Sequence, residues 1–244
     1  MSSPGDLLAL AEAAVDGAEE IFNAGFGAPE LRLHEKNGGD FATTADLLIE
    51  KHLRATLVQS SGIGVYGEES GGDLEGSGTT WLVDPIDGTA NYAAQNPNCG
   101  ILVSLLHHGR PVVAVASFPK LGIRLAASKD GGVRGLPKVA PHPQQHIGCS
   151  SQLSSQLFAD IRGVGLKPRI SGSVGLDLAF AAMGVMAGAI NFSPHPWDSA
   201  AGVLLVEEAG KQVSAADGSA WRVGADGVVA GEANTHENLL ELLH

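Results

Sequence analysis

Features that mark membrane, secreted and nucleic-acid-binding proteins are scarce in this 244-residue sequence. No run of about 18 apolar residues occurs, so we expect no membrane partner. Residues 1–20 are acidic and amphipathic, whereas a signal peptide combines a basic segment with an apolar one. The formal net charge is −12 and basic clusters are missing, which argues against a nucleic-acid partner. A substrate that carries phosphate would therefore need a local cation.

Cysteine is also rare, with only Cys99 and Cys149 present, and their spacing is not that of a metal site. A single disulfide would add little to a core of this size, so we expect reduced thiols in a cytoplasmic protein. Hydrophobic residues make up 44% of the chain and charged residues 17%, which is enough to bury a substantial core in one large domain or two small ones.

The apolar pattern changes its rhythm along the chain. Residues 1–134 combine helices near 4–21 and 45–59 with paired strands, which indicates an antiparallel sheet and helices. Residues 147–244 alternate strand-like and helix-like segments, as in an α/β layer. Residues 135–146 are rich in proline and lack periodicity, so we expect the connecting segment there. The pattern therefore predicts an α+β fold with an N-terminal antiparallel-sheet lobe and a C-terminal α/β lobe.

The helix expected over residues 45–59 carries a candidate functional residue near its start. We expect Thr43 or Thr44 to cap this helix and Asp46 to lie in its first turn, where the helix dipole favours a carboxylate. Its predicted apolar face is a set of residues three and four apart: Leu48, Ile49, Leu53 and Leu57.

Three acidic motifs stand apart from the remaining charge: YGEES with Glu68 and Glu69, DPIDGT with Asp84 and Asp87, and PWDSAAG with Asp198. Each lies at the edge of an expected element, where sheets present functional groups. Taken alone, an Asp-Gly step is typical of a solvated turn, and Asp198 is typical of a carboxylate that satisfies a helix start.

Taken together, the motifs favour a metal site. Hard cations such as Mg²⁺ prefer oxygen ligands, and carboxylates from separate elements can supply one face of the octahedron. In DPIDGT the proline stiffens the turn and removes a donor, which leaves the Ile86 carbonyl free to point into the site. If Gly88 and Thr89 open a helix, their amides would face a phosphate oxygen. The motif then joins metal ligands to a phosphate cradle.

Five motifs in order resemble those of the inositol monophosphatase superfamily of metal-dependent, commonly lithium-sensitive phosphatases. They cover nearly the whole chain: KNGGDFATTAD, GEES, WLVDPIDGTANY, GSVGLDLAFAAMG and PWDSAAGVLLVEEAGKQV. The resemblance implies that the two lobes form a layered αβαβα sandwich and that each site holds two or three Mg²⁺ ions. Glu68, Asp84 and the Ile86 carbonyl would hold one ion, and Asp84, Asp87 and Asp198 would hold a second.

The resemblance also implies the remaining roles. Asp46 and Thr89 would orient the attacking water and help deprotonate it, with Glu68 beside them in the catalytic centre, and the Gly88 and Thr89 amides would bind phosphate. We expect Glu69 to contact the metal ligands without binding the metal itself. Such a site is physically sufficient, because two cations acidify bound water and stabilise the attacking and leaving oxygens.

The sequence departs from the family at the position that recognises the alcohol. Inositol-binding members usually carry an acidic residue seven positions before the aspartate of the WD motif, and here that position is Asn191. Asp87 and Asp198 would share substrate binding with it. An amide both donates and accepts hydrogen bonds but lacks charge, so we expect a phosphate monoester of inositol, a sugar or a related polyol.

Other readings stay open. Within the superfamily they are phosphatases for histidinol phosphate, fructose 1,6-bisphosphate or 3′-phosphoadenosine-type nucleotides, although only Phe192 and His195 are available near the WD motif to contact a base or a second phosphate. A non-catalytic, protein-binding member is a further alternative. The resemblance also implies a homodimer. Lys36, which precedes the D-x-x-T-x-x-D-like part of the first motif, would form either a salt link or a loop contact to the site.

Overall fold

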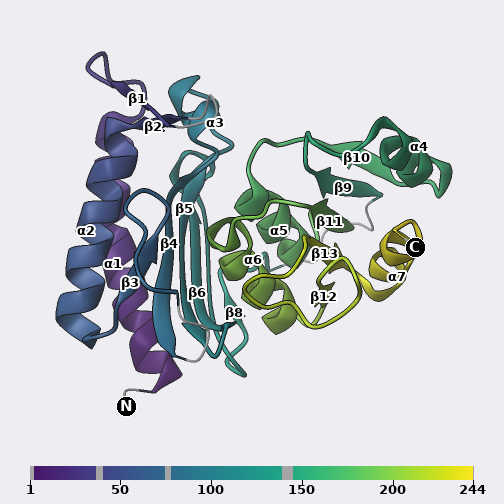
Figure 1. The fold of residues 1–244 in the computed structure, drawn as a ribbon. Coiled ribbons are helices and arrows are strands. Elements are labelled where there is room, and N and C mark those ends of the chain that lie inside the picture. The colour runs from purple at the N-terminus through teal and green to yellow at the C-terminus, as the bar shows by residue number, and fades with distance from the viewer. Residues whose placement is uncertain (1–2, 37–40, 75–77, 139–144, 244) are drawn as a thin grey trace.

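The computed structural model of the protein describes residues 3–36, 41–74, 78–138 and 145–243. Its helices and sheets alternate in the layer order αβαβα (Figure 1), which confirms the predicted layered α+β fold. No helix within those ranges is long and apolar enough to cross a membrane.

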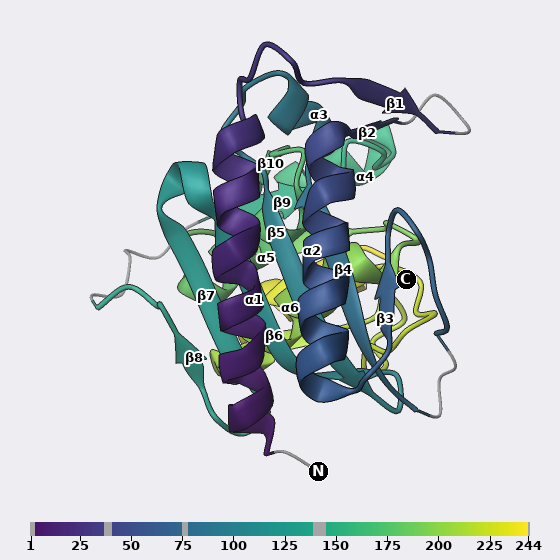
Figure 2. The same cartoon turned by 90° about the vertical axis from the view of Figure 1, so that its left-hand side faces the viewer.

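The first two layers are a pair of helices and a six-stranded sheet. Helices α1 (Pro4–Gly25) and α2 (Thr44–Ser61) lie side by side over one face of the sheet (Figure 2). In spatial order the strands are β3 (Val65–Gly67), β4 (Thr79–Asp87), β5 (Gly100–His107), β6 (Arg110–Phe118), β7 (Ile123–Ser128) and β8 (Val133–Arg134). β3 pairs with β4 in parallel, so the sheet is not wholly antiparallel as predicted, while the other neighbours are antiparallel.

The opposite face of this sheet packs on α5 (Val174–Met183) and α6 (Pro196–Glu208), which form the middle layer. One apolar cluster contains Leu82 and Leu102 from the sheet together with Leu176 and Leu204 from these helices. The sheet and the helices therefore share a core, and side chains at the edge of the sheet lie close to the starts of α5 and α6.

The outer layers are a five-stranded mixed sheet and two flanking helices. The strand order is β10 (Lys167–Arg169), β9 (His146–Cys149), β11 (Gly188–Asn191), β13 (Val228–Gly231) and β12 (Gln212–Ser214), with α4 (Ser155–Gly163) and α7 (Ala233–Glu241) packed against it. β9 is parallel to both of its neighbours, and the other pairs are antiparallel. This alternation of strands and helices was expected for residues 147–244.

Three short elements complete the fold. Strands β1 (Leu33–Glu35) and β2 (Phe41–Thr43) form a two-stranded sheet that precedes α2, helix α3 (Thr89–Ala93) follows β4, and a 3₁₀ turn (Pro119–Leu121) separates β6 from β7. Residues 37–40 of the first motif and 139–144 of the connecting segment lie outside the described residues. The boundary at 135–146 stays a prediction. Cys99 and Cys149 are buried, unpaired thiols.

Helix α2 begins with Thr43 as its N-cap, one of the two residues expected there. The Thr43 hydroxyl accepts from the backbone N–H of Ala45 and Asp46, and the Asp46 carboxylate accepts from the Thr43 N–H, which completes a capping box. The predicted apolar face is wrong at one position. Leu48 is 49% exposed, whereas Glu50 is only 2% exposed and occupies the buried side. The burial of the Glu50 carboxylate is tolerated because it accepts hydrogen bonds from the backbone amides of Glu69 and Ser70.

Candidate active site

The site begins at an irregularity in β4. Asp84 lies opposite Leu102 of β5 and Asp87 lies opposite Gly100, so three steps on one strand match two steps on the other. In a regular strand, residues three apart point to opposite faces, and a bulge changes that alternation. The two aspartates consequently line the same pocket.

That pocket has a volume of about 400 Å³ and collects residues from all five sequence motifs. It is lined by Lys36, Glu68, Asp84, Ile86, Asp87, Gly88, Thr89, Gly172, Val174, His195, Trp197 and Asp198. All the residues expected to bind metal are thus brought together, along with both members of the expected phosphate cradle. Gly88 has φ 82° and precedes α3, so a residue with a Cβ atom would be strained there.

Asp87 is held by the start of α5. The Ser173 hydroxyl and the Gly175 N–H donate to its Oδ2 atom, the latter at 2.8 Å, and the Val174 N–H donates to Oδ1 at 3.1 Å. Burial raises the pKa of Asp87 to about 6, and these three hydrogen bonds oppose the rise because they favour the carboxylate. Ser173 also caps α5, and this dual contact was not predicted from the sequence.

Asp84 is the least satisfied carboxylate of the pocket. It is 2% exposed, and its Oδ1 atom is buried without a hydrogen-bond partner. Burial, followed by the negative charges of Glu68, Asp87 and Asp198, raises the pKa of Asp84 well above its usual value. A buried, unpartnered carboxylate oxygen among like charges is the environment that a bound cation relieves. The donor set, carboxylates and a backbone carbonyl, suits Mg²⁺.

The carboxylates nevertheless face other partners as they stand. Glu68 accepts from the Lys36 ammonium at 2.9 Å, and Asp198 accepts from the Ser193 hydroxyl at 2.5 Å. Within the described ranges, no group of three acidic, histidine or cysteine side chains is arranged to hold a metal ion. Metal binding here would therefore require some of these carboxylates to change position.

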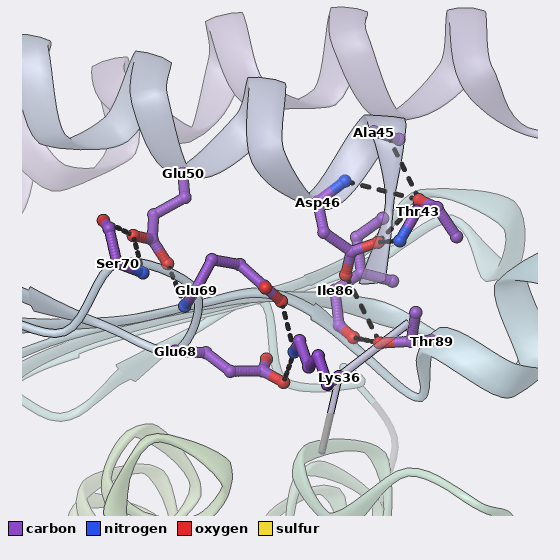
Figure 3. A network of polar contacts seen from close by, with 10 residues as sticks. All are labelled: Lys36, Thr43, Ala45, Asp46, Glu50, Glu68, Glu69, Ser70, Ile86 and Thr89. Carbon is purple, nitrogen blue, oxygen red and sulfur yellow. Dashed lines mark hydrogen bonds and ion pairs between the residues drawn. The ribbon is translucent and has the colours of Figure 1, made fainter. Parts of the chain in front are cut away.

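Asp46 and Thr89 are in contact, as their predicted shared role requires. The Thr89 hydroxyl lies 3.3 Å from Asp46 Oδ1 and 3.0 Å from the Ile86 carbonyl oxygen (Figure 3). Thr89 lines the pocket, and Asp46 lies behind it, fully buried. Burial raises the pKa of Asp46 to about 6 despite its hydrogen bonds from Thr43.

Glu69 and Lys36 extend this network. The Lys36 ammonium bridges Glu68 and Glu69, lying 2.6 Å from Glu69 Oε1 (Figure 3). Lys36 thus makes the salt link that was one of its two predicted contacts. Burial raises the pKa of Glu69 to about 7, even though Lys36 pulls it down. Glu69 is not among the residues that line the pocket, and its role behind the metal ligands stays a prediction.

Asn191 lies in an adjoining pocket of about 510 Å³. The two pockets share Gly172, Val174, His195 and Asp198. The Asn191 Oδ1 atom accepts from the Ser193 N–H at 2.7 Å, so its amide nitrogen is the group left to contact a ligand. Among the other lining residues are Cys149, Ser150, Ser151, Gln152 and Asp177.

An aromatic stack borders the shared part of the two pockets. The His195 ring lies 4.6 Å from the Trp197 ring with an interplanar angle of 13°, and Trp197 stacks on Tyr66 at 5.9 Å. These contacts tie the start of α6 to β3. His195, the N-cap residue of α6, therefore supports the helix start that carries Asp198.

Comparison with known proteins places the chain in a family. Residues 4–244 match the Inositol monophosphatase family. The sequence is 37% identical to inositol-1-monophosphatase ImpA of Mycolicibacterium smegmatis, over 97% of this chain and 91% of that protein. It is 34% identical to histidinol-phosphatase of Mycobacterium tuberculosis, over 98% of each chain. The crystal structure of an IMPase/NADP phosphatase complexed with Mg²⁺ and phosphate has the same fold, with a TM-score of 0.84, 22% identity and coverage of 97% of this chain and 95% of that one. This chain belongs to the inositol monophosphatase family of Mg²⁺-dependent phosphoric monoester hydrolases.

Proposed function

We propose that this protein hydrolyses a small phosphate monoester of inositol, a sugar or a related polyol in a Mg²⁺-dependent reaction. The observation that carries the proposal is the Asp84 carboxylate, which is buried with an unpartnered oxygen in a pocket that also contains Glu68, Asp87 and Asp198. Four carboxylates in one pocket would repel a phosphate dianion unless cations lay between them.

The proposed ligands of one cation are Glu68, Asp84 and the Ile86 carbonyl, and those of a second are Asp84, Asp87 and Asp198. Mg²⁺ at such positions supplies charge to stabilise the attacking and leaving oxygens and lowers the pKa of bound water. Asp87 is oriented by the start of α5 through its contacts with Ser173 and Gly175.

The chain's own groups handle the proton. The Thr89 hydroxyl, within 3.3 Å of Asp46 Oδ1, can accept a proton from water while it donates its own to the carboxylate. Although burial raises the pKa of Asp46 to about 6, the carboxylate is still mostly ionised at neutral pH. The same rise makes it a stronger base than an ordinary aspartate, so it can take part in the proton transfer. The Gly88 and Thr89 amides are the proposed phosphate contacts.

The adjoining pocket is the proposed site of the alcohol. Its polar lining includes Ser150 and Asn191, which can donate to and accept from hydroxyl groups, and Asp198 reaches both pockets. Inositol 1-phosphate is the first candidate because of the 37% identity to an inositol-1-monophosphatase. Histidinol phosphate is the second candidate, because the histidinol-phosphatase relative matches over 98% of both chains and Asn191 lacks the charge usual in inositol-binding members.

We also propose that the protein is a cytoplasmic homodimer. The family resemblance supports the dimer, and the two free buried thiols agree with a reducing compartment. Sedimentation equilibrium of the full chain tests the oligomeric state, and a monomer at micromolar concentration would contradict this proposal.

Phosphate release with and without Mg²⁺ tests the activity. The substrates are inositol 1-phosphate, histidinol phosphate, fructose 1,6-bisphosphate, adenosine 3′,5′-bisphosphate and an aminocyclitol phosphate. We expect one favoured monoester, no turnover in excess chelator, and loss of turnover in Asp84→Asn. Asp16→Asn is the matched control, because this exposed aspartate on α1 pairs with Arg124 and lines neither pocket. Full turnover in chelator would refute the mechanism. A folded, metal-binding protein that hydrolyses none of these substrates would favour the non-catalytic reading.

A further inference from the structure

We infer that Glu50 and Arg54 of α2 are positioning residues that hold the loop carrying Glu68 and Glu69 at the candidate site. The inference rests on the proposed function for what the loop does there. The contacts that define it are independent of that function.

Glu50 is a buried carboxylate bonded to the loop backbone. It is 2% exposed, its Oε2 atom accepts from the Glu69 N–H at 2.7 Å, and its Oε1 atom accepts from the Ser70 N–H at 3.0 Å (Figure 3). The Ser70 hydroxyl also donates to Oε1. Each oxygen thus satisfies a different backbone amide, one of which belongs to the residue directly after Glu68.

Arg54, one helical turn further along α2, closes the same loop from its ends. Its guanidinium donates to the Val65 carbonyl and to the Gly71 carbonyl, both at 2.7 Å, and lies 3.4 Å from Glu50 Oε1. Gly67 and Gly71 are joined by backbone hydrogen bonds in both directions. The planar fork of arginine suits this double contact, so Glu50 holds the middle of the loop and Arg54 its base.

The loop passes directly over the Glu50 carboxylate. A Cβ atom placed on Gly67 would collide with the Glu50 carboxyl group, so glycine at this position permits the close approach. A buried carboxylate with two backbone donors and an arginine beside it is satisfied. Replacing Glu50 by a residue without an acceptor would deprive the Glu69 and Ser70 amides of this partner.

Asp46, Glu50 and Arg54 are four residues apart and therefore follow one side of α2. Asp46 contacts Thr89, and Glu50 contacts the residue next to Glu68. One rigid helix thus sets the separation between the pair proposed to handle the proton and the loop proposed to bind metal. Groups that orient metal ligands in this way typically change metal affinity or activity by about 10- to 100-fold when they are replaced.

The test is Glu50→Gln in the full chain. A glutamine has the same size, but its amide nitrogen cannot accept a hydrogen bond, so either Glu69 or Ser70 loses its acceptor. We expect Mg²⁺ binding measured by calorimetry to weaken about tenfold or more, and phosphate release to recover at high Mg²⁺. We also expect the amides of Glu69 and Ser70 to exchange hydrogen faster, while amides in β5 and β6 do not.

The matched control is Glu207→Gln. Glu207 of α6 also pairs with an arginine, Arg110, at 2.7 Å, but it lines neither pocket. This variant should keep the Mg²⁺ affinity of the parent. It therefore separates the loss of a carboxylate from the loss of the loop contact.

A folded Glu50→Gln variant whose Mg²⁺ affinity stays within about twofold of the parent, or whose loop amides exchange at the parental rate, overturns the inference. If that variant does not fold, Arg54→Lys is measured instead, since lysine cannot bond both carbonyls in the arginine geometry, and the same two readouts decide. A parent that neither binds Mg²⁺ nor releases phosphate refutes the proposed function, while the exchange rates still decide whether Glu50 holds the loop.

Discussion

Asp177 makes the stability of the protein depend on pH. This residue of α5 is 3% exposed, and its Oδ1 atom is buried without a hydrogen-bond partner. Burial raises its pKa from 3.8 to about 8, partly opposed by Ser171 and further raised by the charge of Asp87. Between these two values the folded protein keeps the proton and the unfolded chain has lost it. Stability is therefore fully present below pH 3.8 and falls as pH rises toward 8.

The magnitude follows from the size of the shift. A rise of about 4 units corresponds to at most about 6 kcal/mol, reached gradually at about 1.4 kcal/mol per pH unit. An asparagine side chain cannot ionise, so Asp177→Asn should gain stability over the parent as pH rises, and the gain should level off above pH 8. Urea unfolding of parent and variant at a series of pH values from 5 to 9 measures this difference. Parallel stability curves over that range would refute the reasoning.

Four other substitutions test the packing that holds the site. Ser173→Ala removes the cap of α5 and should cost about 1 to 2 kcal/mol in urea unfolding; an unchanged midpoint would contradict its capping role. Leu48→Lys should change stability by less than about 0.5 kcal/mol, whereas Ile49→Ala should cost about 2 to 5 kcal/mol, because only Ile49 is buried. Equal losses of stability in the two variants, measured by thermal melting, would contradict the observed buried face of α2. Tyr92→Phe should cost about 0.5 to 1.5 kcal/mol, since it removes the 2.7 Å hydrogen bond to the Phe22 carbonyl, which keeps its bond from the Phe26 N–H. A circular dichroism melt equal to that of the parent would contradict this contribution.

The sequence pattern predicted most of the helices and strands, because apolar alternation and helical spacing are local properties. Register is not local. The bulge between Asp84 and Asp87 depends on how β4 pairs with β5, and nothing within DPIDGT shows that its two aspartates line one pocket. The parallel pairing of β3 with β4 escaped prediction for the same reason.

The residues of the candidate site were named mainly from the family resemblance. Hydrophobic spacing cannot show which element edges meet, so Glu68 and Asp198 would have remained ordinary acidic residues without the ordered motifs. Glu50 shows the converse error. A rule that assigns charged residues to solvent excludes it from the buried face of α2, yet its carboxylate satisfies two loop amides. The available signal was its four-residue spacing from Asp46 and Arg54.

The pocket is built against its own stability. Asp84, Asp87 and Asp46 have pKa values raised by burial and by the charges of their acidic neighbours, so at neutral pH each carboxylate costs the folded protein free energy relative to the unfolded chain. Lys36 is the only lysine or arginine among the described residues that line the pocket, and one ammonium cannot balance four carboxylates. A core selected for stability alone would replace such a group of carboxylates with apolar residues. This protein instead keeps the four carboxylates beneath the rigid helix α2 and beside the capped start of α5. Such a conflict between local stability and function marks a site for cations.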